Sequence, residues 1–352
     1  MTTLAPTLAA RPQPVRLPAW FWPTAIVLVA YGVVPFLGTP YLFDAILTPF
    51  LVLSLAALGL NLLTGYAGQL SLGSAAFMAV GAFAAYNANL RVPGLPLLAS
   101  LAFGGVMAAL VGLVFGLPSL RLRGFYLAVS TLAAQFFVQW ALTKFSWFSN
   151  DNPSGVIDAP PLRVAGVSFD GPIGRYLFAL TIVLALTALA ARIVATQTGR
   201  DFIAVRDNEL AARVIGVKVL RTKLLAFLLS SFVIGVAGAL WAFAYLHIVE
   251  PAGFNLDRSF QILFIVIIGG LATTRGAFLG AALIVVFPLV LSRLGQAVFG
   301  GLFDSGVLDM SQRIVLGALI IGFLIAEPEG LAALCRRITN RLGRQIRLRP
   351  GT

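Results

Sequence analysis

Long apolar segments separated by short polar ones run through almost the whole chain. Most of these segments approach the roughly 20 residues that a helix needs to cross a bilayer. The eighth is short and meets the ninth at Ala272–Gly276, which predicts a broken or re-entrant helix there. We therefore expect an all-α, polytopic integral membrane protein with about ten transmembrane helices, at 20–37, 42–63, 71–89, 96–118, 124–142, 176–196, 223–246, 260–272, 277–292 and 312–326.

Composition supports this class. Hydrophobic residues make up 59% of the 352 residues and charged residues 11%, with a mean hydropathy of +0.94, whereas a soluble domain carries about 25% charged residues. The single cysteine, Cys335, excludes an internal disulfide and a cysteine-based metal cluster. We predict a disordered tail over 1–19, with no signal peptide, a transmembrane permease domain over 20–334 and a basic tail over 335–352.

The distribution of charge predicts the orientation. With the amino terminus inside and ten alternating spans, the inner segments carry a formal +13 and the outer segments −1, matching the net charge of +12. This asymmetry follows the positive-inside rule. It predicts cytoplasmic termini, a cytoplasmic loop at 197–222 and a periplasmic loop at 143–175. The basic tail then serves topology and attraction to anionic lipid, with no role for nucleic acid.

The cytoplasmic loop has helical character. Asp207 or Asn208 can cap a short helix, and Glu209 falls in its first turn, where a carboxylate suits the helix dipole. Leu210, Ala211, Val214 and Ile215 then span one apolar face, with Arg213 off that face and Gly216 placed to end the helix. We interpret 207–216 as a docking helix; the alternative is a basic anchor that only fixes topology.

Ionisable groups are missing from the centres of all ten predicted spans. Ion-coupled transporters usually need such groups as a relay inside the membrane. A membrane enzyme would need a cluster of acids, bases or ligands, and His247 is the only histidine. Any uphill transport must therefore draw its energy from outside this chain.

Uncharged polar residues and glycines gather instead in Asn61–Ala85. They can line a hydrated path without binding tightly, or hydrogen-bond between helices. Small residues at close spacing, such as Gly235 and Gly238, favour close helix contact. Spans two to five and seven to ten suggest an inverted repeat. The residues predicted to line a translocation path are Asn61, Thr64, Gly65, Gln69, Ser71, Ser74, Gly269 and Gly270.

Several blocks, in order, resemble the LivM-type permeases of branched-chain amino acid ABC importers. The resemblance covers about Ile46 to Leu334. Its most specific blocks are NLLTGYAGQLSLG (61–73) and GRDFIAVRDNELAARVIG (199–216). The other matching blocks are GLPSLRLRGFYLAVSTLA (116–133), VIGVAGALWA (233–242), IVIIGGLATTRGAFLGAAL (265–283) and EPEGLAAL (327–334).

The resemblance implies a type II ABC-importer-like fold and a subunit that moves amino acids across a bacterial inner membrane. It implies two ATPase subunits of the LivF/LivG type, a second permease of the LivH type and a periplasmic amino-acid-binding protein. The chain has no phosphate loop, so ATP and Mg would bind the ATPases. The coupling residues, similar to an E-A-A…G signature with Leu210 inserted, would be Asp207, Asn208, Glu209, Leu210, Ala211, Ala212, Arg213, Ile215 and Gly216.

One departure concerns the substrate. LivM-type chains carry a T-G-G-rich turn in the external loop, where this chain has SNDNPSG (149–155). The substrate could therefore be a branched-chain amino acid, another amino acid, urea or a short amide. A self-contained secondary transporter or channel is the alternative from another class; it leaves the docking helix unexplained.

Overall fold

A computed structural model describes residues 21–119, 125–152, 156–164, 167–299 and 330–337, together with isolated positions between 314 and 327. The chain divides into two compact units, Met1–Thr39 and Pro40–Thr352. In the first unit the described residues form α1 (Phe21–Gly32) and α2 (Val34–Leu37). The predicted tail at 1–19, most of the tenth span at 312–326 and most of the basic tail lie outside the described residues.

The second unit is built almost entirely of helices. α3 (Pro40–Leu42), η1 (Phe43–Leu47), α4 (Thr48–Asn61) and η2 (Leu62–Tyr66) follow one another without a gap. The further labelled helices of the described residues are α5 (Ser74–Arg91), α6 (Leu97–Ser119), α7 (Phe125–Lys144), η3 (Ser146–Ser149), α8 (Pro172–Ala195), α9 (Gln197–Asp207), α10 (Glu209–Val214), α11 (Val219–Leu240), η4 (Trp241–Leu246), η5 (Pro251–Phe254), α12 (Leu256–Gly269) and α13 (Thr274–Phe299), and residues 331–337 are helical as well.

Six helical stretches within the described residues are long and apolar enough to cross a membrane. They are Pro40–Tyr66, Leu97–Leu117, Pro172–Ala195, Val219–Leu246, Pro251–Gly269 and Thr274–Arg293. The prediction of a polytopic helical membrane protein is confirmed. The count of about ten spans and the inverted repeat are not.

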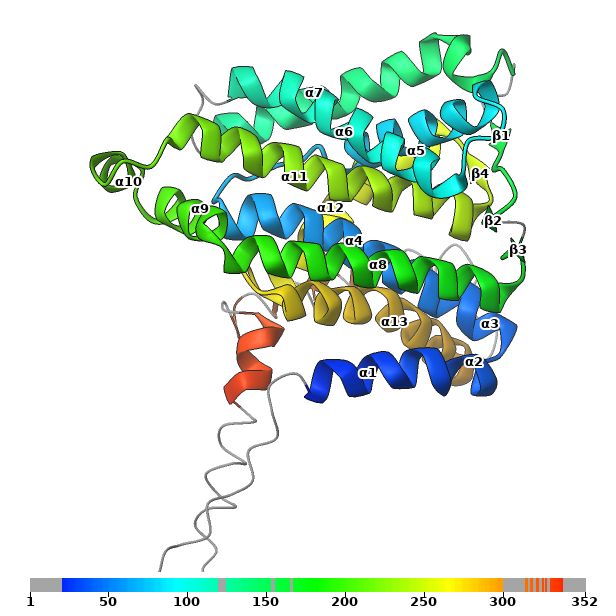
Figure 1. Cartoon of the computed structure of the whole chain (residues 1–352). Helices are drawn as coiled ribbons and strands as arrows, with labels where there is room; N and C mark the ends of the chain where they lie inside the picture. Colours follow the sequence, from blue (N-terminus) through cyan, green and yellow to red (C-terminus); the bar gives the residue numbers. More distant parts are fainter. Residues whose placement is uncertain are drawn as a thin grey trace, which may run out of the picture. The chain divides into compact units, whose positions relative to one another are not determined.

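Two small β-ladders depart from the all-α prediction. β1 (Ile157–Asp158) pairs antiparallel with β4 (Ile248–Val249), and β2 (Arg163–Val164) pairs with β3 (Val167–Ser168). The strands lie at one end of the second unit, and α9 and α10 project from the other (Figure 1). The loop predicted at 143–175 and the loop predicted at 197–222 therefore lie at opposite ends of the helices.

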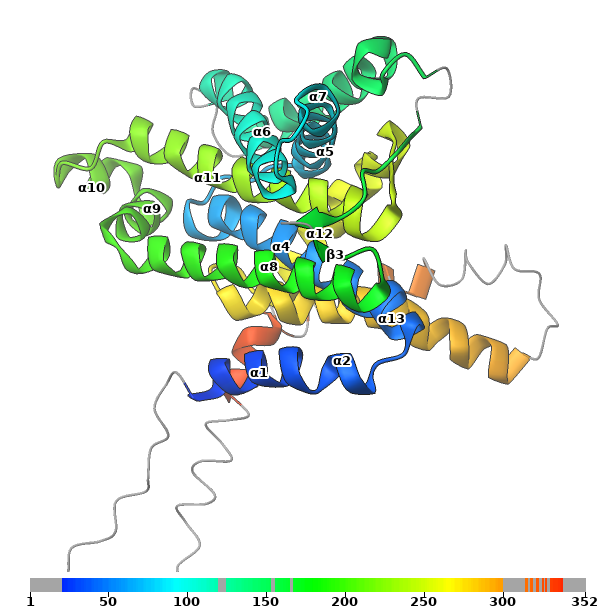
Figure 2. The same ribbon diagram turned by 45° about the vertical axis from the view of Figure 1, so that its right-hand side comes forward.

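Helix α11 is the central helix of this unit. It packs against α4, α5 and α6, with α5, α6 and α7 on one side and α4 and α8 on the other (Figure 2). Where α5 crosses α11, a Cβ on Gly81 would overlap the backbone of Gly235, and one on Gly238 would overlap the backbone of Met78. The prediction that Gly235 and Gly238 serve close helix contact is confirmed.

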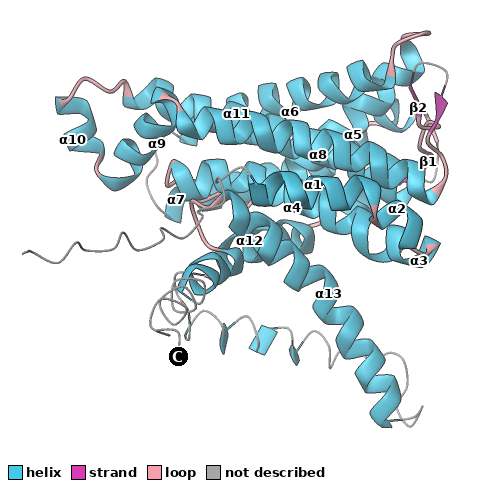
Figure 3. Cartoon of the chain, turned by 60° about the horizontal axis from the view of Figure 1, so that its bottom comes forward, coloured by secondary structure: helices cyan, strands magenta, loops and turns pink. Residues whose placement is uncertain are grey.

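The backbone breaks between α12 and α13, as the sequence predicted. Gly270 has φ 111° and Ala272 has φ 56°, so the helix stops at Gly269 and a new one starts at Thr274 in a different direction (Figure 3). A second break separates η2 from α5, where 67–73 is not helical. Gln69, Ser71 and Gly270 lie in these two breaks, and the other residues predicted to line a path lie in the helices that flank them.

Candidate functional site

The cytoplasmic-loop prediction corresponds to α9, α10 and the turn into α11. Asn208 lies between the two short helices with an extended backbone, and its Oδ1 accepts from the N–H groups of Leu210 (3.0 Å) and Ala211 (3.1 Å). Of the two residues predicted as caps, Asn208 is therefore the one that caps α10. The helix itself, Glu209–Val214, is shorter than the predicted 207–216. Asp207 instead forms an ion pair with Arg206 at 2.9 Å.

Gly216 ends α10 in a left-handed conformation, with φ 90°. Its N–H donates to Arg213 O (3.0 Å), and the N–H of Val217 donates to Ala212 O (2.9 Å). This pair of hydrogen bonds is the Schellman motif, which satisfies the last carbonyls of a helix. The predicted role of Gly216 in closing the helix is confirmed.

The apolar residues of α10 face away from the rest of the chain. Leu210 is 68% exposed, Val214 88% and Ile215 73%. The opposite side of the helix is anchored by Ala212, which is buried against Val205 of α9 and Val219 of α11. A short helix is thus fixed at its base while it presents three large apolar side chains outward, a surface suited to a groove on another protein.

Glu209 does not lie free at the rim of this surface, which corrects one expectation from the sequence. Its carboxylate forms an ion pair with Lys223 Nζ of α11. The Lys223 side chain is 11% exposed and that of Glu209 25%. A buried ammonium needs such a partner because desolvating an unpaired charge is costly. Arg213, in contrast, is exposed, as predicted.

The same region contacts the first backbone break. Lys223 O accepts from Gln69 Nε2 at 3.5 Å, a long hydrogen bond within the core. Arg206 of α9 donates from Nη1 to Gly65 O at 3.0 Å. Hydrogen bonds therefore join α9 to η2 and the start of α11 to the first break.

Asn61, the last residue of α4, is hydrogen-bonded to the second break. Its Oδ1 accepts a hydrogen bond from Ala272 N (2.9 Å) and its Nδ2 donates one to Thr273 O (2.9 Å). Both the acceptor and the donor of the buried side-chain amide are therefore satisfied. Gly65 is required beside it, because a Cβ at that position would overlap Asn61 Oδ1. Hydrogen bonds therefore join Lys223 of α11 to Gln69 in the first break and Asn61, at the end of α4, to the second break; η2 connects Asn61 to the first break along the chain.

The predicted path residues are brought together, but mostly inside the chain. Thr64 is the half-buried member, and its hydroxyl donates to Gln69 O at 3.1 Å. Ser71 Oγ accepts from Gly73 N at 3.4 Å. The buried members are Asn61, Gly65, Gln69, Ser71, Ser74, Gly269 and Gly270. In this conformation they hold helix ends in place, and their role in a path stays a prediction.

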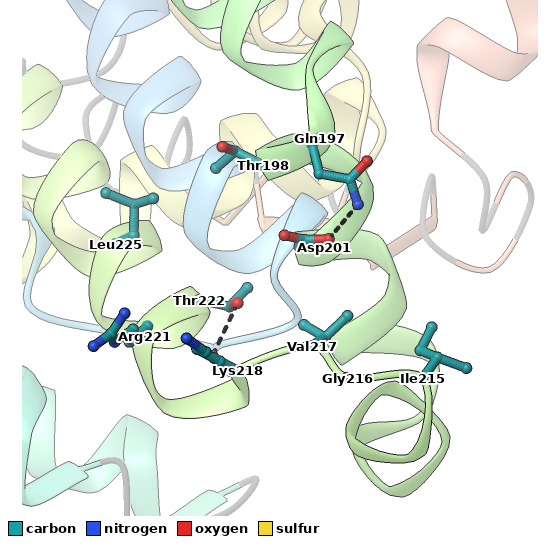
Figure 4. A pocket seen from close by; sticks show the side chains of 10 residues that line it. All are labelled: Gln197, Thr198, Asp201, Ile215, Gly216, Val217, Lys218, Arg221, Thr222 and Leu225. Carbon is teal, nitrogen blue, oxygen red and sulfur yellow. Dashed lines mark hydrogen bonds between the residues drawn. The ribbon is translucent and has the colours of Figure 1, made fainter.

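A polar recess lies beside the carboxyl end of α10 (Figure 4). It has a volume of about 410 Å³ and lies between α9, the turn after α10 and the start of α11. Gln197 donates to Asp201 at 2.8 Å along one wall, and Thr222 donates to Lys218 O at 3.1 Å on the other. The polar groups of this recess, together with the exposed Arg221, therefore lie next to the exposed apolar side chains of α10.

At the opposite end, the 143–175 loop is tied to the helices. Arg175 Nη1 lies 2.7 Å from Nε2 of His247, which has φ 62°. Asp170 accepts from the hydroxyl of Ser168 and from Leu162 N, and these hydrogen bonds, the Ser168 bond first, lower the pKa of Asp170. In the described part of SNDNPSG (149–155), Asn150 and Asp151 both have positive φ.

Arg258 is a candidate functional residue that the sequence did not indicate. Its guanidinium carbon lies 4.2 Å from the ring centroid of Trp241, in a helical stretch long and apolar enough to span a membrane. The predicted eighth span began at 260, so Arg258 was placed in the preceding loop. The N-cap residue Asn255, which accepts from Arg258 N at 3.1 Å, was the sequence signal for the earlier helix start. Within the described residues, no group of three or more His, Cys, Asp or Glu side chains could hold a metal ion.

The long apolar helices define a multi-pass membrane protein, which carries a fixed, outward-facing loop helix and two backbone breaks. Comparison with known families specifies the class further. The family described as the permease component of branched-chain amino acid transport systems matches residues 42–324. This chain belongs to that family of ABC transporter permeases, and it is a multi-pass inner-membrane protein.

Individual relatives differ in the substrate that their names give. The chain is 30% identical to the high-affinity branched-chain amino acid permease LivM of Escherichia coli K12, over 83% of this chain and 70% of the relative. It is 28% identical to the autoinducer 2 import permease LsrC of an Enterobacter species, over 84% of each chain. It is 30% identical to the ribose import permease RbsC of Bacillus subtilis, over 41% of this chain and 42% of the relative. No solved structure matches the chain.

Proposed function

We propose that this chain is the transmembrane permease subunit of an ATP-driven importer of branched-chain amino acids. Two ATPase subunits of the LivF/LivG type would supply the energy, a second permease of the LivH type would complete the channel, and a periplasmic binding protein would deliver the substrate. The family supports the transporter class, and the LivM relatives support the substrate.

The observation that carries the coupling role is the position of α10. Its apolar residues are exposed, while Glu209 and Ala212 fix its base to α11 and α9. A docked ATPase could therefore displace α10 as a unit. Such a displacement would act through Lys223 and Gln69 on the first backbone break, and from there through Asn61 on the second. A basic loop that only fixed topology would need none of these contacts.

We propose that the end carrying α9 and α10 is cytoplasmic, with both termini on that side. The excess of basic residues in the loop supports this orientation. Ten spans remain the proposed count, with the tenth at 312–326. The substrate would pass between this chain and the second permease, past Asn61–Ser74 and Gly269–Gly270, after the two breaks open.

Co-expression with the ATPase, second permease and binding-protein subunits tests this function. We expect the chain to co-purify with both ATPases, and proteoliposomes of the complex to take up leucine when ATP is present. Uptake of ribose in place of leucine would retain the transporter class and reject the amino-acid substrate. Transport by the isolated chain would favour a self-contained transporter, and uptake of urea or short amides would assign the chain to a sister system.

A further inference from the structure

The first turns of α5 and α12 meet inside the chain. Ala75 N of α5 donates to Ser259 Oγ of α12 at 2.9 Å. Gln135 of α7 links the same two turns, since its Oε1 accepts from Ala76 N (2.6 Å) and from Ser259 Oγ (3.2 Å). The amino-terminal end of a helix carries a partial positive charge. Two such ends are therefore held together by neutral side chains.

A full positive charge lies in the same turn of α12. Arg258 precedes Ser259 and stacks on the ring of Trp241, and its Nη1 donates to Gln261 Oε1 at 2.5 Å. Among the described residues, no carboxylate oxygen lies within 4.0 Å of the Arg258 nitrogens. The preceding residue, Asp257, is exposed and acts on Arg258 only through space, without an ion pair. A cation in an apolar helical stretch is costly without a close counter-charge.

Three buried polar groups at this position have no hydrogen-bond partner. They are Arg258 Nε, Trp241 Nε1 and Ser74 Oγ, and Trp241 and Ser74 are 3% and 0% exposed. The arginine and tryptophan nitrogens can only donate. Native proteins seldom leave buried donors unpaired, so this cluster lacks an acceptor, and the most suitable acceptor beside a guanidinium is a carboxylate.

We propose that Arg258, held by Trp241, binds the carboxylate of the transported amino acid during its passage, next to the first turn of α5. This inference rests on the proposed function, which it deepens by naming the group of the substrate that is recognised. Arg258 as a whole is partly exposed, although its Nε is buried. The site also separates amino acids from neutral sugars, because an uncharged hydroxyl is a weaker partner for a desolvated cation than a carboxylate is.

The first experiment measures leucine uptake by the reconstituted complex with Arg258→Gln and Arg258→Lys. Loss of a hydrogen bond between charged groups should lower leucine uptake about ten- to a hundredfold in Arg258→Gln. Arg258→Lys keeps the positive charge and should retain partial uptake. The matched control is Arg91→Gln, because Arg91 also stacks on a tryptophan, Trp147, at 3.8 Å but is exposed. Co-purification with the ATPases checks that each variant assembles.

A second experiment reports on binding itself. The complex is labelled with 5-fluorotryptophan, and the ¹⁹F resonance of Trp241 is assigned with Trp241→Phe. Leucine should move this resonance in the wild type but not in Arg258→Gln, and leucinol, which lacks the carboxylate, should move it far less. Normal uptake by an assembled Arg258→Gln complex, or equal responses to leucine and leucinol, would overturn the carboxylate site alone. Absence of leucine uptake by the wild type would instead overturn the proposed function and, with it, this site.

Discussion

Lys223 of α11 forms an ion pair with Glu209 of α10 although the two residues belong to separate helices and the lysine side chain is only 11% exposed. Removing one partner of a buried pair costs about 3–5 kcal/mol. Because Glu209 is partly solvated, we expect roughly 1–3 kcal/mol for Glu209→Gln. Thermal unfolding of the purified complex measures this change.

Exchanging the charges of Glu209 and Lys223 tests whether their ion pair, and not the packing of the two side chains, provides the stability. Glu209→Lys with Lys223→Glu should recover part of the stability and of the coupled ATP hydrolysis that each single variant loses. Asp207→Asn is the matched control, because its ion pair with Arg206 is exposed and worth about 0–1 kcal/mol. Equal effects of Asp207→Asn and Glu209→Gln would contradict the structural role of the Lys223 pair.

Asn61 provides the second prediction. Asn61→Ala leaves Ala272 N and Thr273 O, its partners at the second break, without the side chain that satisfies them. We expect a loss of about 1–3 kcal/mol in unfolding free energy, together with reduced leucine uptake. Asn152→Ala, at an exposed loop position, should change stability by less than about 0.5 kcal/mol. An Asn61→Ala complex with wild-type stability and uptake would show that the two breaks act independently.

The conformation of Gly216 leads to a prediction about backbone strain. A Cβ at this position would meet nothing within 4 Å, but φ is 90°. Gly216→Ala should therefore cost about 1–2 kcal/mol for conformational reasons alone, Gly216→Asn less, and Gly216→Val more. Gly171→Ala is the control, since that glycine also has open space but no positive φ. Limited proteolysis of the loop and thermal unfolding measure the effect; a tolerated Gly216→Val would contradict the role of the Schellman turn.

Orientation is tested by labelling. In a Cys335→Ser background, single cysteines at Asn152 and Asn208 are both exposed and lie in the two loops at opposite ends of the helices (Figure 1). An impermeant thiol reagent added to whole cells should label the cysteine at 152, and the one at 208 only after the membrane is permeabilised. Labelling with the opposite sidedness would reverse the proposed topology.

Much of this architecture was predictable from the sequence because its determinants are local. Hydropathy located the long helices, and the capping residue Asn208 and the helix-ending Gly216 act within a few residues of their own positions. The contacts that join the site were not predictable. Asn61 and Thr273 are 212 residues apart, and Lys223 is an ordinary basic residue until the fold places it beside Glu209.

Arg258 illustrates a different limit. A hydropathy window moves the start of a span away from charged residues, so the predicted segment began at 260 and excluded it. The structure instead begins α12 at Leu256 and stabilises the guanidinium by stacking on Trp241. Nothing in a single sequence indicates that a tryptophan 17 positions earlier lies close enough to make this contact.

Coupling through α10 is tested most directly by ATP hydrolysis in the reconstituted complex, with and without binding protein and leucine. Truncating a buried interface anchor typically costs about 1–4 kcal/mol, so Leu210→Ala with Ile215→Ala should abolish the stimulation by substrate and stop uptake, while the binding protein still docks. Leu189→Ala, at an exposed leucine of α8, should leave both unchanged. Full substrate-stimulated hydrolysis and normal uptake in the Leu210→Ala, Ile215→Ala complex would contradict a coupling role for α10 and leave the loop as a topology anchor.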